Sequence, residues 1–264
     1  MTLRSLTLLV LAQVVAVGWG YRESAAGSIT GRNATTNTVV FSDNGFEDDT
    51  AGSPPNAPAT GSWTAIQGIG TGVDVATPFP ALVTNDVSPG PNDGLNYFIV
   101  NRPSNNNSQR PLLIANLASP VTGSDILAFS FAFQRGTGSL QMILADSVGN
   151  AIANVTSNTG AGAWNLFNGA FSVGGATALP NSGSFWQDVT LRYAADGSLY
   201  ELTVDGQTAL FSGTPTSGPL GRIEFRTNGI GSWYIDGIVP EPSSIVLLGL
   251  GIGGVMLRSR RRMS

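Results

Sequence analysis

The alternation of apolar and polar residues through the middle of the chain predicts β-strands. Apolar residues occupy every second position of Ile126–Phe133, of Leu199–Asp205 and of Gly221–Arg226. A period of two places alternate side chains on opposite faces of a strand, so each segment is expected to bury one face and expose the other. No stretch of residues 21–240 sustains a 3.6-residue apolar period for the length of a helix. The chain is therefore expected to be all-β.

Turn residues join these segments into an antiparallel fold. Asp196-Gly197 and Asp205-Gly206 stand between apolar runs, and Asp-Gly is a favoured pair in hairpin turns. They predict a three-stranded meander over residues 185–211, with strands at Phe185–Tyr193, Leu199–Asp205 and Thr208–Phe211. Further strands are expected at Val39–Ser42, Trp63–Gln67, Asn96–Val100, Leu112–Ala115, Leu140–Asp146, Ile152–Val155, Trp164–Phe167 and Trp233–Ile238. So many short strands predict two packed antiparallel sheets, a β-sandwich of the jelly-roll type.

The N-terminal residues have a different pattern. Residues 1–20 combine one early charge, Arg4, with an apolar stretch and small residues near Gly20, which is typical of a secretory signal peptide in helical form. An uncleaved membrane helix is the alternative, although the apolar stretch is short for a bilayer span. Residues 21–37 are rich in small and polar residues and are expected to be a flexible lead-in. The sandwich domain is then expected to occupy residues 38–238.

The C-terminal residues 239–264 carry three features in a fixed order. Pro240, Glu241 and Pro242 come first, and prolines cannot join a helix interior, so they separate a folded domain from the C-terminal residues beyond them. The apolar run Ile245–Leu257 would form a helix only about 20 Å long, against a hydrocarbon core of about 30 Å. A cluster of arginines comes last and is expected to stop translocation; its members are Arg258, Arg260, Arg261 and Arg262.

This order and spacing resemble the PEP-CTERM sorting signal of Gram-negative bacteria. The resemblance implies a protein that passes the export translocon and is held in the inner membrane by its C-terminal helix. It also implies cleavage near Pro240-Glu241-Pro242 by an exosortase, a membrane transpeptidase. The expected destination is the cell surface or the extracellular matrix.

Composition narrows the chemistry that is left. The chain has no His, Cys or Lys, so the usual zinc, copper and haem ligands are missing, as are Ser-His-Asp, Cys-His and Schiff-base catalysis. Residues 21–240 hold eight arginines against sixteen acidic residues, a net charge of −8. An acidic surface argues against nucleic-acid binding, which needs basic patches. Carboxylates, hydroxyls, amides, aromatic rings or a hard cation remain.

The second half of the sandwich resembles concanavalin-like and laminin-G-like domains. The residues that carry this resemblance are Trp186-x-x-Val189-x-Leu191-x-Tyr193, Tyr200-x-Leu202-x-Val204-Asp205-Gly206 and Tyr234-Ile235-Asp236-Gly237-Ile238. It implies a protein that binds glycans or other proteins, since most members do so and some hydrolyse polysaccharides.

The remaining chemistry suggests three kinds of site. Asp43 and Glu47 in an acidic loop, together with Asp236, would supply oxygen ligands for a structural calcium ion, and a solvated acidic loop is the alternative. Trp186 falls on the polar phase of its strand and is the best candidate for stacking on a sugar ring, although Trp in a sandwich more often belongs to the core. The Glu-x-Asp-x-x-Glu run of concanavalin-like glucanases is missing, so no catalytic residue is expected.

The sequence therefore predicts an exported, non-catalytic protein with a structural or adhesive role and a possible polysaccharide partner. A carbohydrate-binding module is the first alternative, and a polysaccharide-active enzyme is the second.

Overall fold

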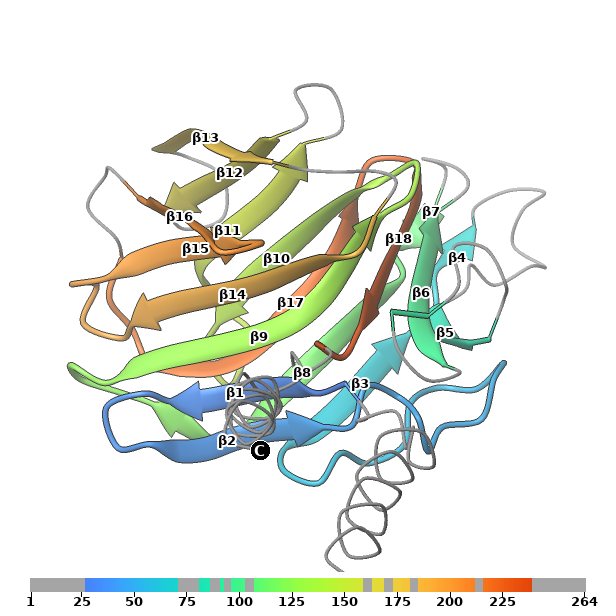
Figure 1. Ribbon diagram of the computed structural model, residues 1–264, viewed down its shortest axis with the longest axis horizontal. Helices are drawn as coiled ribbons and strands as arrows, with labels where there is room; N and C mark the ends of the chain where they lie inside the picture. Colours follow the sequence, from blue (N-terminus) through green and yellow to red (C-terminus); the bar gives the residue numbers. More distant parts are fainter. Residues whose placement is uncertain are drawn as a thin grey trace, which may run out of the picture. The chain divides into compact units, whose positions relative to one another are not determined.

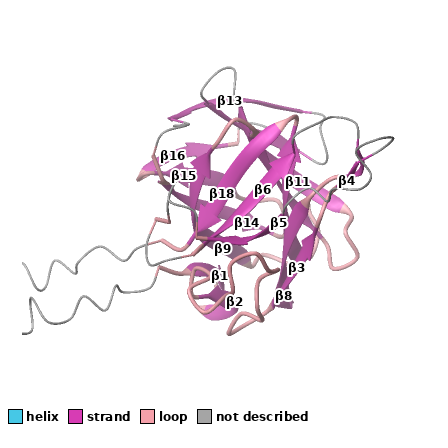
Figure 2. Cartoon of the chain, turned by 90° about the vertical axis from the view of Figure 1, so that its right-hand side faces the viewer, coloured by secondary structure: helices cyan, strands magenta, loops and turns pink. Residues whose placement is uncertain are grey.

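β-Strands are the only regular elements in the residues that the computed structural model of the chain describes: 27–70, 81–85, 91–92, 96–102, 107–158, 163–168, 173–180, 185–211 and 216–238. All of these strands belong to one compact unit, Ala26–Ile238 (Figures 1 and 2). They form two large antiparallel sheets, so the all-β prediction is confirmed. The expected signal helix and C-terminal hydrophobic helix lie outside the described residues.

The larger sheet has nine strands. Its main path has the order β16 (Gln207–Leu210), β15 (Tyr200–Val204), β14 (Gln187–Ala194), β9 (Ile126–Arg135), β18 (Gly231–Asp236), β6 (Tyr97–Arg102) and β5 (Ala81–Thr84). Off this path, β1 (Ile29–Asn33) pairs with β9, and β2 (Thr38–Asp43) pairs with β1. One edge of β9 binds β14, whereas the other edge is shared between β1 and β18.

The second sheet has seven strands. Their order is β13 (Val173–Pro180), β12 (Ala163–Asn168), β11 (Ala151–Asn158), β10 (Ser139–Ala145), β17 (Leu220–Asn228), β8 (Leu112–Val121) and β3 (Ser62–Ile66). β17 lies between β10 and β8, third from the edge that β3 forms. A separate two-stranded sheet joins β4 (Ile69–Gly70) to β7 (Asn107–Gln109).

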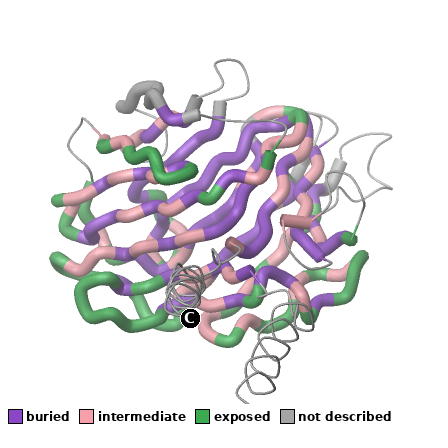
Figure 3. Tube along the Cα trace, viewed as in Figure 1, coloured by how far each residue is buried: buried purple, intermediate pink, exposed green. Residues whose placement is uncertain are grey.

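Large aromatic side chains fill the space between the two sheets. Phe225 of β17 meets Phe129 and Phe131 of β9, with ring centroids 6.0 and 5.3 Å apart. Phe133 of β9 likewise meets Trp164 of β12 at 5.2 Å. Each of these residues is fully buried, and buried aromatics contribute much of the stability of such a core. Buried residues, purple in Figure 3, run along the central strands of the sandwich. Because Phe225 points inward, its neighbours on β17 must point outward.

The predicted meander over residues 185–211 is confirmed as β14, β15 and β16. Asp205 and Gly206 join the last two strands with φ angles of 48° and 77°. Positive φ at both central residues is the geometry of a type I′ turn, which Asp-Gly favours.

The lead-in expected over residues 21–37 is different in the structure, because it contains strand β1. A Cβ added to Gly31 of this strand would lie 2.9 Å from the ring of Phe129, so β1 approaches β9 closely because it has a glycine at this position. β1 therefore lacks the alternating large apolar residues from which a strand is predicted. The folded domain accordingly begins earlier than residue 38.

Candidate functional site

Each sheet presents an outward surface of different chemistry. We call the outward side chains of the seven-stranded sheet the seven-strand face; its residues are Thr64, Ile114, Asn116, Gln141, Ile143, Asn154, Thr156, Arg222, Glu224 and Arg226. We call those of the larger sheet the nine-strand face; its residues are Thr30, Ser130, Gln134, Thr190, Arg192, Glu201, Thr203, Thr208, Tyr97 and Tyr234, with Trp186 just before β14.

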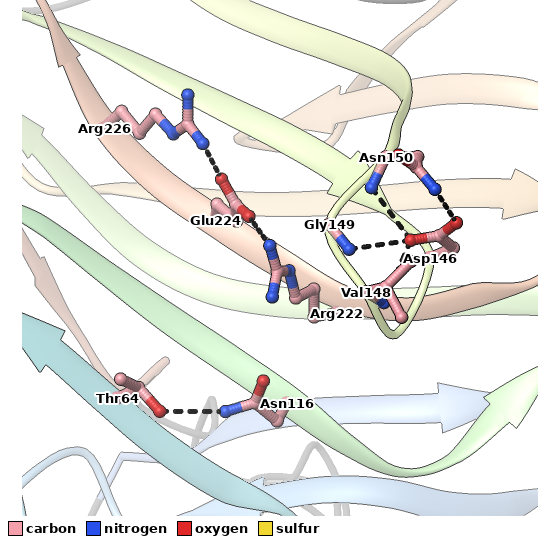
Figure 4. A network of polar contacts seen from close by, with 9 residues as sticks. All are labelled: Thr64, Asn116, Asp146, Val148, Gly149, Asn150, Arg222, Glu224 and Arg226. Carbon is pink, nitrogen blue, oxygen red and sulfur yellow. Dashed lines mark hydrogen bonds and ion pairs between the residues drawn. The ribbon is translucent and has the colours of Figure 1, made fainter.

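A row of three charges crosses the middle of the seven-strand face along β17. Glu224 is ion-paired on one side to Arg222, whose Nη2 lies 2.6 Å from Oε1, and on the other side to Arg226, which contacts Oε2 (Figure 4). The Glu224 side chain is only 2% exposed, whereas the Arg222 and Arg226 side chains are 22% and 36% exposed. Two solvent-accessible guanidinium groups therefore cover one carboxylate, and the row has a net charge of +1.

The β10–β11 hairpin holds Arg222 in place. The Asp146 carboxylate accepts hydrogen bonds from the backbone of Val148, Gly149 and Asn150 and from the Asn150 side chain (Figure 4). These bonds, led by that of the Asn150 side chain, lower the pKa of Asp146. Gly149 has a φ of +100°, and a Cβ at this position would lie 1.8 Å from Nη2 of Arg222. The hairpin is thus shaped so that the guanidinium packs directly against its backbone.

Amides and apolar side chains surround the charged row. Gln141 lies opposite Arg226 across the β10–β17 pair and is 1% exposed. On the other side of β17, Asn116 lies opposite Arg222 and donates to Oγ1 of Thr64 at 3.1 Å. Three buried polar atoms of this face have no hydrogen-bond partner: Nε2 of Gln141, Nε of Arg222 and Nε of Arg226. All three are donors.

The nine-strand face pairs its polar groups among themselves. The Oγ1 atoms of Thr203 and Thr208 are 2.8 Å apart, and Oγ of Ser130 lies 2.9 Å from Oγ1 of Thr190. Its ion pair joins Arg192 to Glu201. This surface therefore offers hydroxyl groups that already have partners.

Trp186, the expected sugar-stacking residue, is partly exposed beside this face. Its ring meets the edge of Tyr97 at a centroid distance of 5.9 Å, and Tyr97 meets Tyr234 at 5.8 Å. Trp164 and Trp233 are fully buried. Trp186 stays the best sugar-stacking candidate among these residues, and that role remains a prediction.

The acidic loop after β2 lies against Asp236. A Cβ on Gly45 of this loop would be 3.0 Å from the backbone N of Gly237 and 3.2 Å from Oδ1 of Asp236. The calcium hypothesis required the acidic loop to lie near Asp236. A pair of hydrogen bonds between Ser28 and Ile238 brings the two ends of the domain together.

The three expected calcium ligands each accept hydrogen bonds from protein donors. Asp43 accepts from the backbone of Gly45 and Phe46 through Oδ1 and from Nε1 of Trp63 through Oδ2. Burial raises the pKa of Asp43 despite these bonds. Asp236 and Glu47 accept from backbone N–H groups.

Among the described residues, no three acidic side chains gather closely enough to hold a metal ion. Calcium binding stays a prediction, which a calcium titration monitored by thermal unfolding would test.

The charged row on β17 was not expected as a site. The signal was present, because Arg222, Glu224 and Arg226 alternate with apolar residues and so share one face of a strand. The sequence could not predict which residues lie beside the row. Gln141 and Asn116 are placed there by the pairing of β17 with β10 and β8, and Gly149 by the hairpin that follows β10.

The comparisons with known proteins concern the C-terminus and the fold separately. Residues 239–262 match the PEP-CTERM protein-sorting motif, which confirms the expected sorting signal. The motif indicates an exported protein that is processed at the membrane, and it implies an exosortase as the processing enzyme. Pro240, Glu241, Pro242 and the four terminal arginines lie outside the described residues. Within the described part of the chain, no helix has the length and hydropathy that a membrane crossing requires.

No curated protein sequence matches the chain. Among solved structures, a sialidase is 13% identical with a TM-score of 0.45 and covers 66% of this chain, which spans 16% of that protein. A β-glucanase from Bacillus licheniformis is 13% identical with a TM-score of 0.42, covering 70% of this chain and 94% of its own. A carbohydrate-binding module from Bacillus subtilis is 11% identical with a TM-score of 0.38, covering 67% and 92%.

Proposed function

We propose that this protein is an exported, non-catalytic adhesive component of the cell surface or extracellular matrix, and that its seven-strand face holds a polysaccharide. The proposal includes passage through an intermediate anchored in the inner membrane by the C-terminal apolar run before an exosortase cuts the chain. The sorting motif at residues 239–262 supports the export route.

The charged row on the seven-strand face carries the binding part of the proposal. Arg222 and Arg226 remain accessible above a floor that contains Ile114 and Ile143. Sugar rings present apolar C–H faces and a rim of hydroxyls, so a surface that places polar groups beside aliphatic side chains suits them. Both oxygens of Glu224 are engaged by guanidinium groups, which supports a role as charge partner in preference to that of a catalytic acid.

A retention assay on immobilised polysaccharides, charged and neutral, tests this function. Asn116→Leu removes a polar group from the seven-strand face at nearly constant volume and should weaken retention several-fold. Thr203→Val makes a similar change on the nine-strand face and should leave retention unchanged. Failure of every polysaccharide to bind would sink the proposal, and release of reducing sugar by the wild type would favour the enzyme instead.

Trp186 supports a second candidate, a carbohydrate-binding module that works through the nine-strand face. Its partly exposed ring beside Tyr97 and Tyr234 is the observation in favour. Sugar stacking on Trp186 would change tryptophan fluorescence, and Trp186→Ala would abolish that change. A fluorescence response that survives Trp186→Ala would argue against this second candidate.

A further inference from the structure

We infer that the ligand of the seven-strand face is a polysaccharide with carboxylate groups, and that Arg222 and Arg226 recognise those carboxylates. This inference rests on the proposed function and adds the chemical class of the ligand. It depends on three features of the face: its charge, its unpartnered donors and the way in which the guanidinium groups are held.

The charge of this sheet runs against that of the chain. The charged residues of its seven strands are Arg222, Glu224 and Arg226, which give a net charge of +1. The negative charge nearest to this row in the hairpin is Asp146, whose carboxylate is engaged by four hydrogen bonds of its own turn. The whole chain has a net charge of −4. A local positive charge on an acidic protein steers anionic groups to one place and repels them elsewhere, which provides orientation as well as attraction.

The unpartnered atoms of the face are all hydrogen-bond donors. Nε of Arg222, Nε of Arg226 and Nε2 of Gln141 lie buried without a partner, and Gln141 is 1% exposed. A buried donor without an acceptor is unfavourable, so a ligand that brings acceptors is stabilised here. A carboxylate is an acceptor-only group with two oxygens, whereas a sugar hydroxyl is donor and acceptor at once.

The guanidinium groups are held in position for such a ligand. Gly149 packs against Nη2 of Arg222, and the Glu224 carboxylate contacts the Nη2 atoms of both Arg222 and Arg226. A guanidinium has five N–H donors arranged as a fork that fits a carboxylate, so one contact with Glu224 does not exhaust it.

Polygalacturonate and its fully methyl-esterified form test the inference, because they share a backbone and differ in charge. With the purified full chain, esterification should lower the affinity at least about tenfold, and added salt should weaken binding of the charged polymer only. Arg226→Gln should weaken binding of polygalacturonate by about tenfold or more, since it removes a charge-assisted contact. Arg192→Gln is the matched control, because it also removes an arginine paired with a glutamate, and it should bind like the wild type.

Arg226→Lys keeps the charge beside Glu224 and guards against misreading an unfolded variant. It should fold like the wild type and bind with intermediate affinity, because an ammonium lacks the planar fork. Equal binding of both polymers would overturn the inference and leave the proposed function standing for neutral glycans. The inference also falls if Arg192→Gln weakens binding as much as Arg226→Gln. Absence of binding to polygalacturonate overturns it too, and the neutral polysaccharides of the retention assay then decide the proposed function.

Discussion

The two sheets of the sandwich differ in the charges that their strands carry. The nine strands of the larger sheet contain four arginines and four carboxylates: Arg32, Arg102, Arg135, Arg192, Asp43, Asp188, Glu201 and Asp236. The seven strands of the other sheet contain two arginines and one glutamate. The first sheet is balanced, whereas the second has an excess positive charge. The excess on β17 is the feature that the proposed carboxylate ligand would neutralise.

The unpartnered atoms differ in the same sense. On the nine-strand face, Oε1 of Gln134 is a buried acceptor without a partner. On the seven-strand face, three buried atoms without partners are donors, and they surround the charged row. Among the outward side chains of the two sheets, unused donors and positive charge therefore occur together on the seven-strand face; Arg135 of the larger sheet, whose Nε is also buried, lies opposite the buried Trp233 on the inward side of β9. A comparison of matched substitutions on the two faces can therefore separate a binding surface from an ordinary wet one.

The largest effect is expected when the glutamate of each ion-paired group becomes a glutamine. Glu224 is 2% exposed between two arginines, so Glu224→Gln should lower the free energy of unfolding by about 2–3 kcal/mol. Glu201 is 13% exposed and its partner Arg192 is 40% exposed, so Glu201→Gln should cost less than about 1 kcal/mol. Urea unfolding of the two variants measures both values. Equal losses would show that the two faces hold their charges alike.

Glu224→Gln also tests the direction of the binding argument. Since Glu224 competes with a ligand for both arginines, its loss leaves two unneutralised guanidinium groups and should raise the affinity for polygalacturonate several-fold at low salt. Glu201→Gln should change this affinity little. Weaker binding by Glu224→Gln, in a sample shown to be folded, would mean that Glu224 supports binding, by positioning the two guanidinium groups or by contacting the ligand, and does not compete with it.

A smaller effect is expected from Gly149, which supports Arg222 from the hairpin. Gly149→Ala places a Cβ at a φ of +100° and forces Nη2 of Arg222 to move. Gly229 has a φ of +101° and nothing within 4 Å of an added Cβ, so Gly229→Ala carries the backbone strain without the clash. The strain should cost each variant about 1–2 kcal/mol. Only Gly149→Ala should also weaken polygalacturonate binding, by a few-fold. Equal binding by both variants would show that Arg222 needs no support from the hairpin.

The strands with large apolar residues at alternate positions could be predicted from the sequence. β9 and β17 bury Phe129, Phe131 and Phe225 at every second position, and both strands were expected. β1 was not predicted because it has a glycine, Gly31, at the position that lies opposite Phe129 of β9. The close packing there depends on the missing side chain, which leaves no apolar alternation in the sequence. Alternation along a strand shows which residues share a face, so the sequence indicated that Arg222, Glu224 and Arg226 lie on the same face of β17.

The neighbours of that row were not available from the sequence. Gln141 lies opposite Arg226 and Asn116 opposite Arg222 only because β17 pairs with β10 and β8, which precede it by many residues. Register between distant strands depends on the whole core, and no local pattern encodes it. The acidic loop illustrates the same limit, because its charge was evident but the hydrogen bonds from Trp63 and the backbone to Asp43 were not.

The smallest expected effect is the change of stability with pH, which should differ between the acidic loop after β2 of the larger sheet and the β10–β11 turn of the smaller sheet. Burial raises the pKa of Asp49, in the loop after β2, to about 6, above its usual 3.8. Hydrogen bonds lower the pKa of Asp146, in the β10–β11 hairpin, below 3.8. A raised pKa means that the folded state takes up the proton first, so stability rises as pH falls through about 6. A lowered pKa means that stability is present above 3.8 and is lost as pH falls through the folded value.

Acidification should therefore act on the two loops in opposite directions. From about pH 7 to pH 5 the unfolding free energy should rise by about 1 kcal/mol, with allowance for solvent screening at the loop. Asp49→Asn should reduce this rise. Burial also raises the pKa of the neighbouring Asp43. Asp146→Asn should leave the rise intact and reduce the loss of stability in stronger acid. Thermal unfolding from pH 7 into acid below pH 3.8 measures both effects. If the unfolding free energy of Asp49→Asn rises as much as that of the wild type, Asp49 is not desolvated. The loop after β2 and the β10–β11 turn would then differ only in their hydrogen bonds.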